Sequence, residues 1–440
     1  MAQQTNNFSN WISQQIEADT TFTLSDAVRS PSRSRLAEGI FPTRKDEEWR
    51  YTPLGQILES SPDMDSRSAV TPEFINKLKD AMPQAHTLVF INGQYSENFS
   101  DNQTHLENAG LRISRFSQLN STQLQMVEET ILNAALTDDN IFQHITLGLA
   151  QNGLFIELAQ NVDTQTTLHI IHISSAQGDT SFTNPVQVVR CGENSHLKMV
   201  EQFTSLGQAA VITVPASYIQ MDKGAGLVHY KIGIENNETN HVSNTSVRVA
   251  ESGTYQSHQY LLGSKLTRSN LEVSFTGPDG HAVLRGIYLG DENQHLDMRT
   301  YMDHAHPHCS SDQHFRGILN GHARGVFNGM VLVRKDAQKT DAQQTNKNLL
   351  LSRDARVDTK PQLEIFADDV KCAHGATIGE LDPDALFYLQ SRGIGKKDAA
   401  LMLTRAFAAE ISQEIELISL QDYLQDKIAA SLNEIVNASI

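Results

Sequence analysis

Short runs rich in Val, Ile, Thr and Tyr alternate with Gly/Asn/Asp turns between about residues 140 and 375, where helical periodicity almost disappears. Residues 227–234 are one such run, and alternation of this kind predicts β-strands. The turns lie at residues 192–194, 223–226, 251–253, 277–280, 290–293 and 321–324. Three of them recur at intervals of roughly 27 residues, a loose period that favours stacked coils over a barrel. In a β-solenoid each coil buries the face of the next. A sandwich with irregular loops fits the same runs, and the period alone does not decide between them.

Both flanks of this region have a helical character. Residues 1–135 are expected to be mostly helical, with Thr71 as an N-cap before Pro72 and a hairpin turn at Asn92 and Gly93. The arginine- and serine-rich residues 29–35 are expected to form a solvated loop. Asp382 and Pro383 begin the C-terminal helices. Three units are therefore expected, which are a helical region (1–135), a β core (136–380) and a helical region (381–440).

The last helix has one apolar face. Its members recur at a spacing of three and four residues; they are Leu420, Tyr423, Leu424, Ile428, Leu432, Ile435 and Val436. Such a stripe fits ordinary core packing, and it also fits a docking face for a partner.

Composition limits the class of partner and the compartment. The 440 residues carry a formal net charge of −17, which argues against nucleic acid or an anionic membrane surface as the main partner. The three cysteines are too few and too scattered for a disulfide framework, so a reducing cytoplasm is expected. We see no secretory signal and no apolar run near the ~20 residues of a membrane span. No GxxxxGK[ST] phosphate loop occurs, so the chain is not expected to hydrolyse ATP.

Cys372 and His374 are the first candidate ligands. The preceding residues 361–366 alternate like a strand, and residues i and i+2 of a strand point to the same face. A thiolate and an imidazole would then lie side by side, and both are ligands for iron. An iron–sulfur cluster normally takes four ligands. Either a partner supplies the others, or the pair is not a site.

A second candidate is the run with His304, His306, His308 and Cys309. Its three histidines share a face if the run is extended, and a transition-metal site is then chemically reasonable. The alternative is a strand broken by Pro307 at the corner of a coil, with solvated histidines. The third cysteine, Cys191, ends a predicted strand and is expected to pack in the core.

Three segments also resemble one known family. Residues 340–395, which contain DDVKCAHGATIG, closely resemble the C-terminal core of the SufB/SufD family of iron–sulfur cluster assembly proteins. Residues 41–54 (FPTRKDEEWRYTPL) resemble the family's N-terminal segment, and residues 323–329 match its VFNG strand. The D-type subunits fit better than the B-type subunits, which are longer and do not carry DDVKCxHGATxG.

The resemblance implies a mainly β fold, a right-handed parallel β-helix with helical flanks. It implies a non-catalytic subunit of a SufBCD scaffold complex, with one B-type subunit paired through the C-terminal strands and two SufC-type ATPase copies on the C-terminal helices. Cys372 and His374 would lie at the B–D interface and share a transient iron–sulfur cluster, so that none is stable on the isolated chain. A reduced flavin is implied for the full complex. The rivals are a metal-free homodimeric scaffold and a β-helix carbohydrate-active enzyme, which would need a carboxylate array that the sequence lacks.

Overall fold

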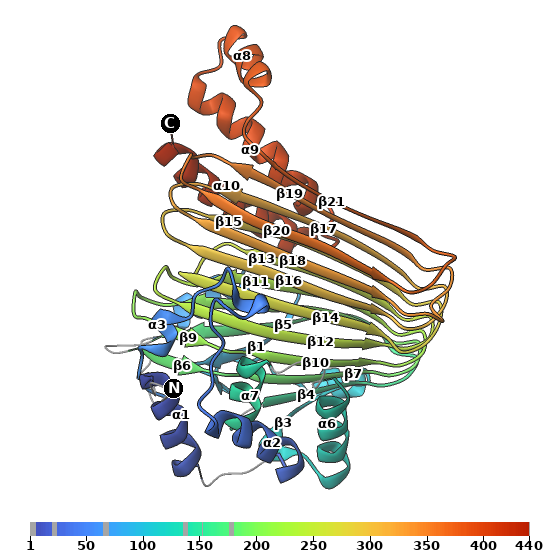
Figure 1. The fold of residues 1–440 in the computed structure, drawn as a ribbon. Coiled ribbons are helices and arrows are strands. Elements are labelled where there is room, and N and C mark those ends of the chain that lie inside the picture. The colour runs from blue at the N-terminus through green and yellow to red at the C-terminus, as the bar shows by residue number, and fades with distance from the viewer. Residues whose placement is uncertain are drawn as a thin grey trace.

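The computed structural model describes residues 6–19, 24–64, 70–134, 140–151, 153–175 and 180–439. The described chain is mainly β, with two long sheets that form a parallel solenoid of about seven turns, and it has helices at both ends (Figure 1). Neighbouring coils pair in parallel, whereas the strands of a sandwich are antiparallel. The predicted parallel β-helix is therefore confirmed.

The first sheet has ten strands in the order β2-β1-β5-β8-β11-β13-β15-β17-β19-β21. Their bounds are β1 (His86–Ile91), β2 (Gln94–Tyr95), β5 (Asp163–Ser174), β8 (His196–Ser205), β11 (Gly226–Ile234), β13 (Thr254–Leu261), β15 (His281–Gly290), β17 (Ser310–Leu319), β19 (Asp341–Leu350) and β21 (Lys371–Gly379). Among the described strands of this sheet, only β1 and β2 pair antiparallel, through the predicted turn at Asn92 and Gly93, which both have positive φ.

The second sheet has eleven strands, with the main order β20-β18-β16-β14-β12-β10-β7-β4-β3, and with β9 beside β12 and β6 beside β9. Their bounds are β3 (Leu111–Arg115), β4 (Gly153–Leu158), β6 (Ser181–Thr183), β7 (Val186–Cys191), β9 (Val211–Thr213), β10 (Ala216–Met221), β12 (Asn240–Val249), β14 (Leu266–Phe275), β16 (His295–His304), β18 (Arg324–Val333) and β20 (Arg356–Ile365). Consecutive strands from β11 onward alternate between the two sheets, so each coil gives one strand to each sheet.

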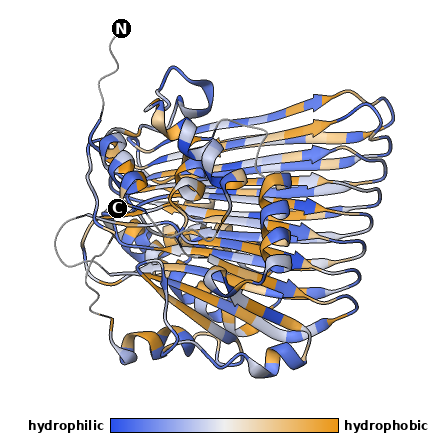
Figure 2. Cartoon of the chain, turned by 90° about the horizontal axis from the view of Figure 1, so that it is seen from below, coloured by the Kyte–Doolittle hydropathy of each residue, from blue (hydrophilic) through white to orange (hydrophobic). Residues whose placement is uncertain are grey.

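The coil length agrees with the loose period in the sequence. Thr254 pairs with His281 and His281 pairs with Ser310, so these coils are offset by 27 and 29 residues. Apolar and polar residues alternate along the strands, as Figure 2 shows. The inward apolar side chains form one continuous core from Leu88 to Ala367. Each coil therefore buries its neighbour's face, as a solenoid requires.

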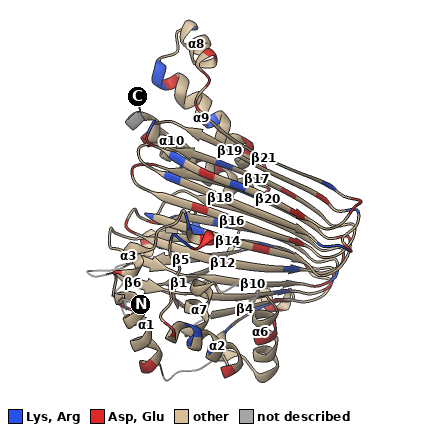
Figure 3. Ribbon diagram, viewed as in Figure 1, with Lys and Arg blue, Asp and Glu red and all other residues tan. Residues whose placement is uncertain are grey.

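One corner of the solenoid is a ladder of similar turns. The residue at this corner has a left-handed conformation in every coil, and the series is Asn161, Asn194, Gly224, Ser252, Asp279, His308 and Lys339. Each donates its backbone N–H to a carbonyl of the next coil, for example His308 to Gln338 at 2.9 Å. Charged residues of both signs lie along the coil edges (Figure 3), and Lys223 pairs with Glu251 at 2.6 Å. The turns are thus fixed by contacts between coils.

The N-terminal region contains helices that surround the first coils. They are α1 (Asn7–Ala18), α2 (Asp26–Ala37), η1 (Glu47–Trp49), α3 (Gly55–Leu58), α4 (Pro72–Lys79), α5 (Thr104–Asn108), η2 (Phe116–Gln118), α6 (Ser121–Ala134) and α7 (Ile141–Gly148). Thr71 caps α4 by accepting from the Phe74 N–H at 3.3 Å, as predicted. Two strands of this region also belong to the sheets: β1 pairs with β5 in the first sheet, and β3 pairs with β4 in the second. The expected boundary between residues 135 and 136 lies outside the described residues.

The expected loop at residues 29–35 is wrong, because these residues belong to α2. Pro31 is inside the helix, and the Arg29 side chain is buried against the Asp19 carboxylate, with which it forms an ion pair. Arg33 also pairs with Asp19, at 2.7 Å. The buried Asp19 carboxylate neutralises two arginines of this segment, so the segment can pack as a helix although its sequence is polar.

The C-terminal helices are α8 (Pro383–Ser391), α9 (Lys396–Ser412) and α10 (Ile418–Ser439). The apolar stripe of α10 is buried against the outer face of the ten-stranded sheet, where Leu424 and Leu432 share a cluster with Tyr260 and Ile318. Of the two interpretations of this stripe, core packing is confirmed and the docking face is wrong. None of the described helices is long and apolar enough to span a membrane.

Candidate functional site at the open end of the solenoid

The last strands of both sheets end the solenoid at the same end of the molecule (Figure 1). β21 is the terminal strand of one sheet and pairs with β19, and β20 is the terminal strand of the other and pairs with β18. Every residue of β21 except Cys372 is exposed. A terminal strand offers unused backbone donors and acceptors to another strand. In the described part of the chain, this end is therefore open to a partner.

Cys372 and His374 lie on β21, as the alternation predicted. Cys372 pairs in register with Ala342 and His374 with Gln344, and both of these neighbours on β19 are buried. Since side chains of registered parallel neighbours lie on one face, both candidates share the face that continues the solenoid interior. The half-buried Cys372 packs against the core, whereas His374 is exposed.

The electrostatic setting of Cys372 favours the thiol. Burial raises the pKa of this thiol above its ordinary value, and the nearby Asp341 carboxylate adds to the rise. A thiol must lose its proton to bind iron or sulfur strongly. The described residues contain no group of three or more His, Cys, Asp or Glu side chains that could hold a metal ion. Cys372 and His374 are therefore two candidate ligands on one face of β21, without a third His, Cys, Asp or Glu beside them among the described residues.

Asp369, three residues before Cys372, has its contacts in the corner turn. Asp369 belongs to the turn ladder, where its carbonyl accepts from the Lys339 N–H at 2.7 Å and its carboxylate pairs with the Lys339 ammonium. Its own N–H donates to the Gln338 side chain at 2.9 Å. These contacts place the start of β21 in register with β19.

Exposed apolar side chains lie on both terminal strands. Ile378 on β21 is 51% exposed, and Ile365 and Phe366 at the end of β20 are 40% and 63% exposed. Large exposed apolar residues on a terminal strand are suited to contact with a partner. Both terminal strands thus combine free backbone groups with apolar side chains.

The structure does not bring the second candidate set together. His304 is buried at the end of β16, where burial lowers its pKa to about 4 and its Nε2 lies 2.9 Å from Ser311 Oγ. His306 and His308 lie in the corner turn after it, and His308 holds the left-handed position of the ladder. Cys309 is buried, its Sγ–H donates to the Gly277 carbonyl at 3.4 Å, and burial raises its pKa to about 11.

The cause is that the run is not extended. The chain turns at Pro307, so the i, i+2 relation of a strand is lost after His304. The structure therefore matches the alternative of a coil corner, and the metal site at His304, His306, His308 and Cys309 has no support from the described residues. Cys191 packs in the core, as expected, and burial raises its pKa to about 12.

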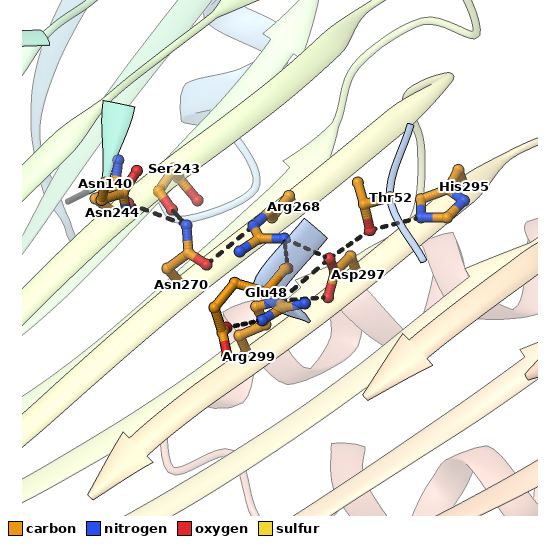
Figure 4. A network of polar contacts seen from close by, with 10 residues as sticks. All are labelled: Glu48, Thr52, Asn140, Ser243, Asn244, Arg268, Asn270, His295, Asp297 and Arg299. Atoms are coloured by element: carbon orange, nitrogen blue, oxygen red, sulfur yellow. Dashed lines mark hydrogen bonds and ion pairs between the residues drawn. The ribbon is translucent and has the colours of Figure 1, made fainter. Parts of the chain in front are cut away.

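Sequence reasoning missed a buried polar network on the outer face of the eleven-stranded sheet (Figure 4). Residues 41–54 cross this face. The guanidinium of Arg268 stacks on the Trp49 ring, with its central carbon 3.6 Å from the ring centroid. Asp297 accepts from Thr52 at 2.6 Å and pairs with Arg268 at 3.1 Å and with Arg299 at 3.2 Å. We call residues 41–54 the strap. The only signal for it in the sequence was its motif.

The strap also reaches the open end. The Glu47 carboxylate pairs with Lys360 on the terminal strand β20. The guanidinium carbon of Arg324, on β18, lies 5.8 Å from the centroid of the Tyr51 ring. The same side chain forms an ion pair with Asp358 on β20, at 2.6 Å. The strap therefore connects the N-terminal region to strands β14, β16, β18 and β20.

Comparison with known proteins decides the family. The SufBD core domain of the SUF system for FeS cluster assembly matches residues 171–407, and the SufBD protein N-terminal region matches residues 3–170. The chain belongs to the SufBD family. The family resemblance found in the sequence is therefore confirmed.

Individual relatives place the chain on the SufD side of the SufBD family. It is 33% identical to the iron–sulfur cluster assembly protein SufD of Escherichia coli (strain K12), over 92% of this chain and 93% of that protein. It is 28% identical to a SufBD family protein of Synechocystis over 88% of this chain and 87% of that protein, and 23% identical to SufD of Bacillus subtilis over 84% of each chain. The chain is a SufD-type member of this iron–sulfur cluster assembly family.

Proposed function

We propose that this SufD-type chain is the D-type subunit of a SufBCD scaffold complex on which iron–sulfur clusters are assembled. A B-type subunit would extend both sheets at β20 and β21, and a SufC-type ATPase would bind the C-terminal helices. The chain itself would catalyse no reaction and would act in the cytoplasm. The single observation that carries the proposal is the open end, where the candidate ligands Cys372 and His374 lie on a terminal strand with an unpaired edge.

The incomplete ligand set supports a shared site. A cluster takes four ligands, so Cys372 and His374 need donors from outside the chain. A partner strand added to β21 would bring such donors to the same face. The cluster is the cargo of this site, and ligands divided between two subunits separate when the interface moves. Nucleotide-driven motion of the ATPase would then release the cluster.

Substitution of Ile378 by aspartate is expected to weaken pairing with the B-type subunit at least about tenfold, the effect of losing ~1.4 kcal/mol of interface free energy. The reason is that the exposed Ile378 side chain would be covered by the partner and a carboxylate would be desolvated there. The measurement is a dissociation constant for the two purified subunits, at matched salt.

Ile40→Asp is the matched control, since Ile40 is exposed to a similar degree, at 44%, but belongs to the N-terminal region. Equal affinity of Ile378→Asp and wild type would remove β21 from the interface. Self-pairing through the same edge is the competing function, because a free strand edge also fits a second copy. A homodimer that persists when the B-type subunit is in excess would favour that alternative.

The apolar face of α10 is not the surface that we propose for ATPase binding. The apolar face of α10 is buried, so α8 and the first half of α9 carry the proposed contact instead. α8 stands beyond the solenoid (Figure 1) and has no buried residue, and its Phe387 and Tyr388 are 72% and 58% exposed. Arg316 of β17 pairs with Glu410 in the last turn of α9, and Arg285 of β15 pairs with Glu414, two residues after α9, at 2.6 Å. These ion pairs hold the C-terminal end of α9 against the sheet that ends at β21.

Simultaneous Phe387→Ala and Tyr388→Ala substitutions are expected to reduce ATPase binding at least about tenfold, because large aromatic anchors carry much of the free energy of such interfaces. Deletion of the C-terminal helices is a poorer test, since it would uncover the apolar face under α10. Leu132→Ala on α6, at the far end of the molecule, is the control. Unchanged ATPase binding by the double variant would refute the assignment of α8.

The reduced flavin implied by the family resemblance belongs to the same proposal at the level of the full complex. We assign no residue of this chain to it. The carbohydrate-active alternative loses its basis, because the chain belongs to an iron–sulfur cluster assembly family.

A further inference from the structure

Gln344 lies directly beside His374 inside the solenoid. It is a buried residue of β19, with Gln313 of β17 as its registered neighbour on one side and His374 of β21 on the other. Parallel neighbours in register are separated by about 4.8 Å, and their side chains stand in one row. Gln344 is therefore the last buried residue of a row that ends at the exposed His374.

The Gln344 amide is held from the side away from His374. Its Nε2 donates to Gln313 Oε1 at 3.4 Å, and the same oxygen accepts from Thr300 Oγ1 at 2.7 Å. Gly329 of the opposite sheet makes room for it, because a Cβ at that position would lie 2.2 Å from Gln344 Nε2. This gives a physical reason for glycine at the end of the VFNG motif.

The other atom of the amide has no partner. Gln344 Oε1 is buried and accepts no hydrogen bond from any described residue. A buried acceptor without a donor costs free energy, and such atoms are rare in folded proteins. The registered neighbour on the other side, His374, has an exposed ring that carries an N–H donor but does not donate to Oε1 in the conformation described.

We propose that Gln344 is a positioning residue for His374, and that the exposed imidazole turns toward Gln344 so that its N–H donates to the unpartnered Oε1. Such a bond fixes which ring nitrogen carries the proton and leaves the other nitrogen with its lone pair free. The free nitrogen then faces the open end, where a shared cluster would be bound. This use of the bond rests on the proposed function, whereas the bond itself does not.

The first test uses the purified full-length chain labelled with ¹⁵N-histidine, at about pH 8.5, where an ordinary imidazole is neutral. Long-range ¹H–¹⁵N spectra give the tautomer ratio of each ring, and the signal of His374 is assigned by its loss in His374→Gln. We expect one dominant tautomer for His374 and a mixture for the exposed His308. An equal mixture at His374 in the wild type overturns the inference without any further variant.

Substitutions at Gln344 provide the second test. Gln344→Met removes the acceptor at similar volume and is expected to shift the His374 ratio to that of His308. Gln344→Glu keeps an acceptor oxygen and should restore the single tautomer. Gln343→Met is the matched control, because Gln343 is the exposed neighbour on the opposite face of β19. A His374 ratio that is the same in Gln344→Met and in the wild type overturns the inference.

A separate measurement in the assembled complex distinguishes this inference from the proposed function. Gln344→Met should lower the iron and sulfide content severalfold at unchanged subunit stoichiometry, and Gln344→Glu should recover it. If the tautomer shifts but the cluster content does not, the positioning bond stands and the role of His374 in cluster assembly fails. If the tautomer does not shift, the positioning bond fails whatever the cluster content.

Discussion

Replacement of His374 by alanine is expected to lower the iron and sulfide content of the assembled complex at least about tenfold, while subunit composition stays the same. His374 is exposed on the terminal strand and faces the space that a partner would cover, so its loss removes a ligand but little packing. A partner cysteine can replace the single thiolate of Cys372, whereas an imidazole that binds iron or transfers a proton has no such substitute. The measurement is iron and acid-labile sulfide per complex after anaerobic co-purification.

His306→Ala is the matched control for this prediction, because His306 is a partly exposed histidine of the corner turn. It should leave the cluster content unchanged, which also tests the unsupported metal site of the His304–His308 run. The isolated wild-type chain is the baseline and should show little charge-transfer absorbance, since the two proposed ligands would leave the other positions of a four-ligand cluster unfilled. Equal cluster content in His374→Ala and wild type would exclude His374 from the mechanism. Loss of the B-type subunit from the variant complex would assign it to interface packing.

Local chemistry predicted those parts of the fold that depend on neighbours in the sequence. Alternation predicted β11 and the shared face of Cys372 and His374, and the cap at Thr71 and the turn at Asn92 and Gly93 formed as expected. Asp382 likewise caps α8 by accepting from the Asp384 N–H at 2.9 Å. Each of these features depends on contacts among a few neighbouring residues, so a short stretch of sequence is enough to predict it.

Features that depend on distant partners were mispredicted or missed. Residues 29–35 form a helix because Asp19 neutralises two of their arginines, and β1 joins a sheet because β5 follows about 80 residues later. The His304–His308 run turns a corner because the next coil supplies the Gln338 carbonyl that accepts the His308 N–H. The position of Gln344 beneath His374 follows from the register between two coils, which no local pattern reveals.

The stripe on α10 shows the same limit for the partner assignment. Its spacing was compatible with core packing and with docking, and only the sheet beneath it decides for packing. The exposed aromatic residues of α8 have no periodic signal, because a nine-residue helix without a buried face presents none. The structure therefore decided which apolar residues the chain itself covers, which spacing along the sequence did not.

Replacement of Asp297 by alanine is expected to destabilise the folded chain by about 3–5 kcal/mol, the range observed when one member of a buried ion pair is removed. The Asp297 side chain is fully buried between Arg268 and Arg299, and the variant would leave both guanidinium groups in the interior with too few acceptors. Burial lowers the pKa of Arg268 to about 9, so this group remains charged at neutral pH. The measurement is the midpoint of thermal and urea unfolding.

Asp303→Ala is the matched control on the same strand. Asp303 pairs with Arg334 at 2.7 Å, but the Arg334 side chain is 56% exposed and becomes hydrated when its partner is lost. The expected cost is about 1 kcal/mol or less. If both variants unfold at the same midpoint, the buried network under the strap does not stabilise the fold.

The dependence of this stability on pH has a definite sign. Desolvation raises the pKa of Asp297, but Arg268 and Arg299 outweigh it, so the folded pKa lies below the ordinary 3.8. A group with a lowered folded pKa contributes stability that is complete above its unfolded pKa and is lost as the pH falls through the folded value. The difference between the wild type and Asp297→Asn should therefore be constant from neutral pH to about pH 5 and should shrink only below about pH 4. A difference that already declines between pH 7 and pH 5 would mean that another group, such as the buried His295 beside Thr52, controls the network.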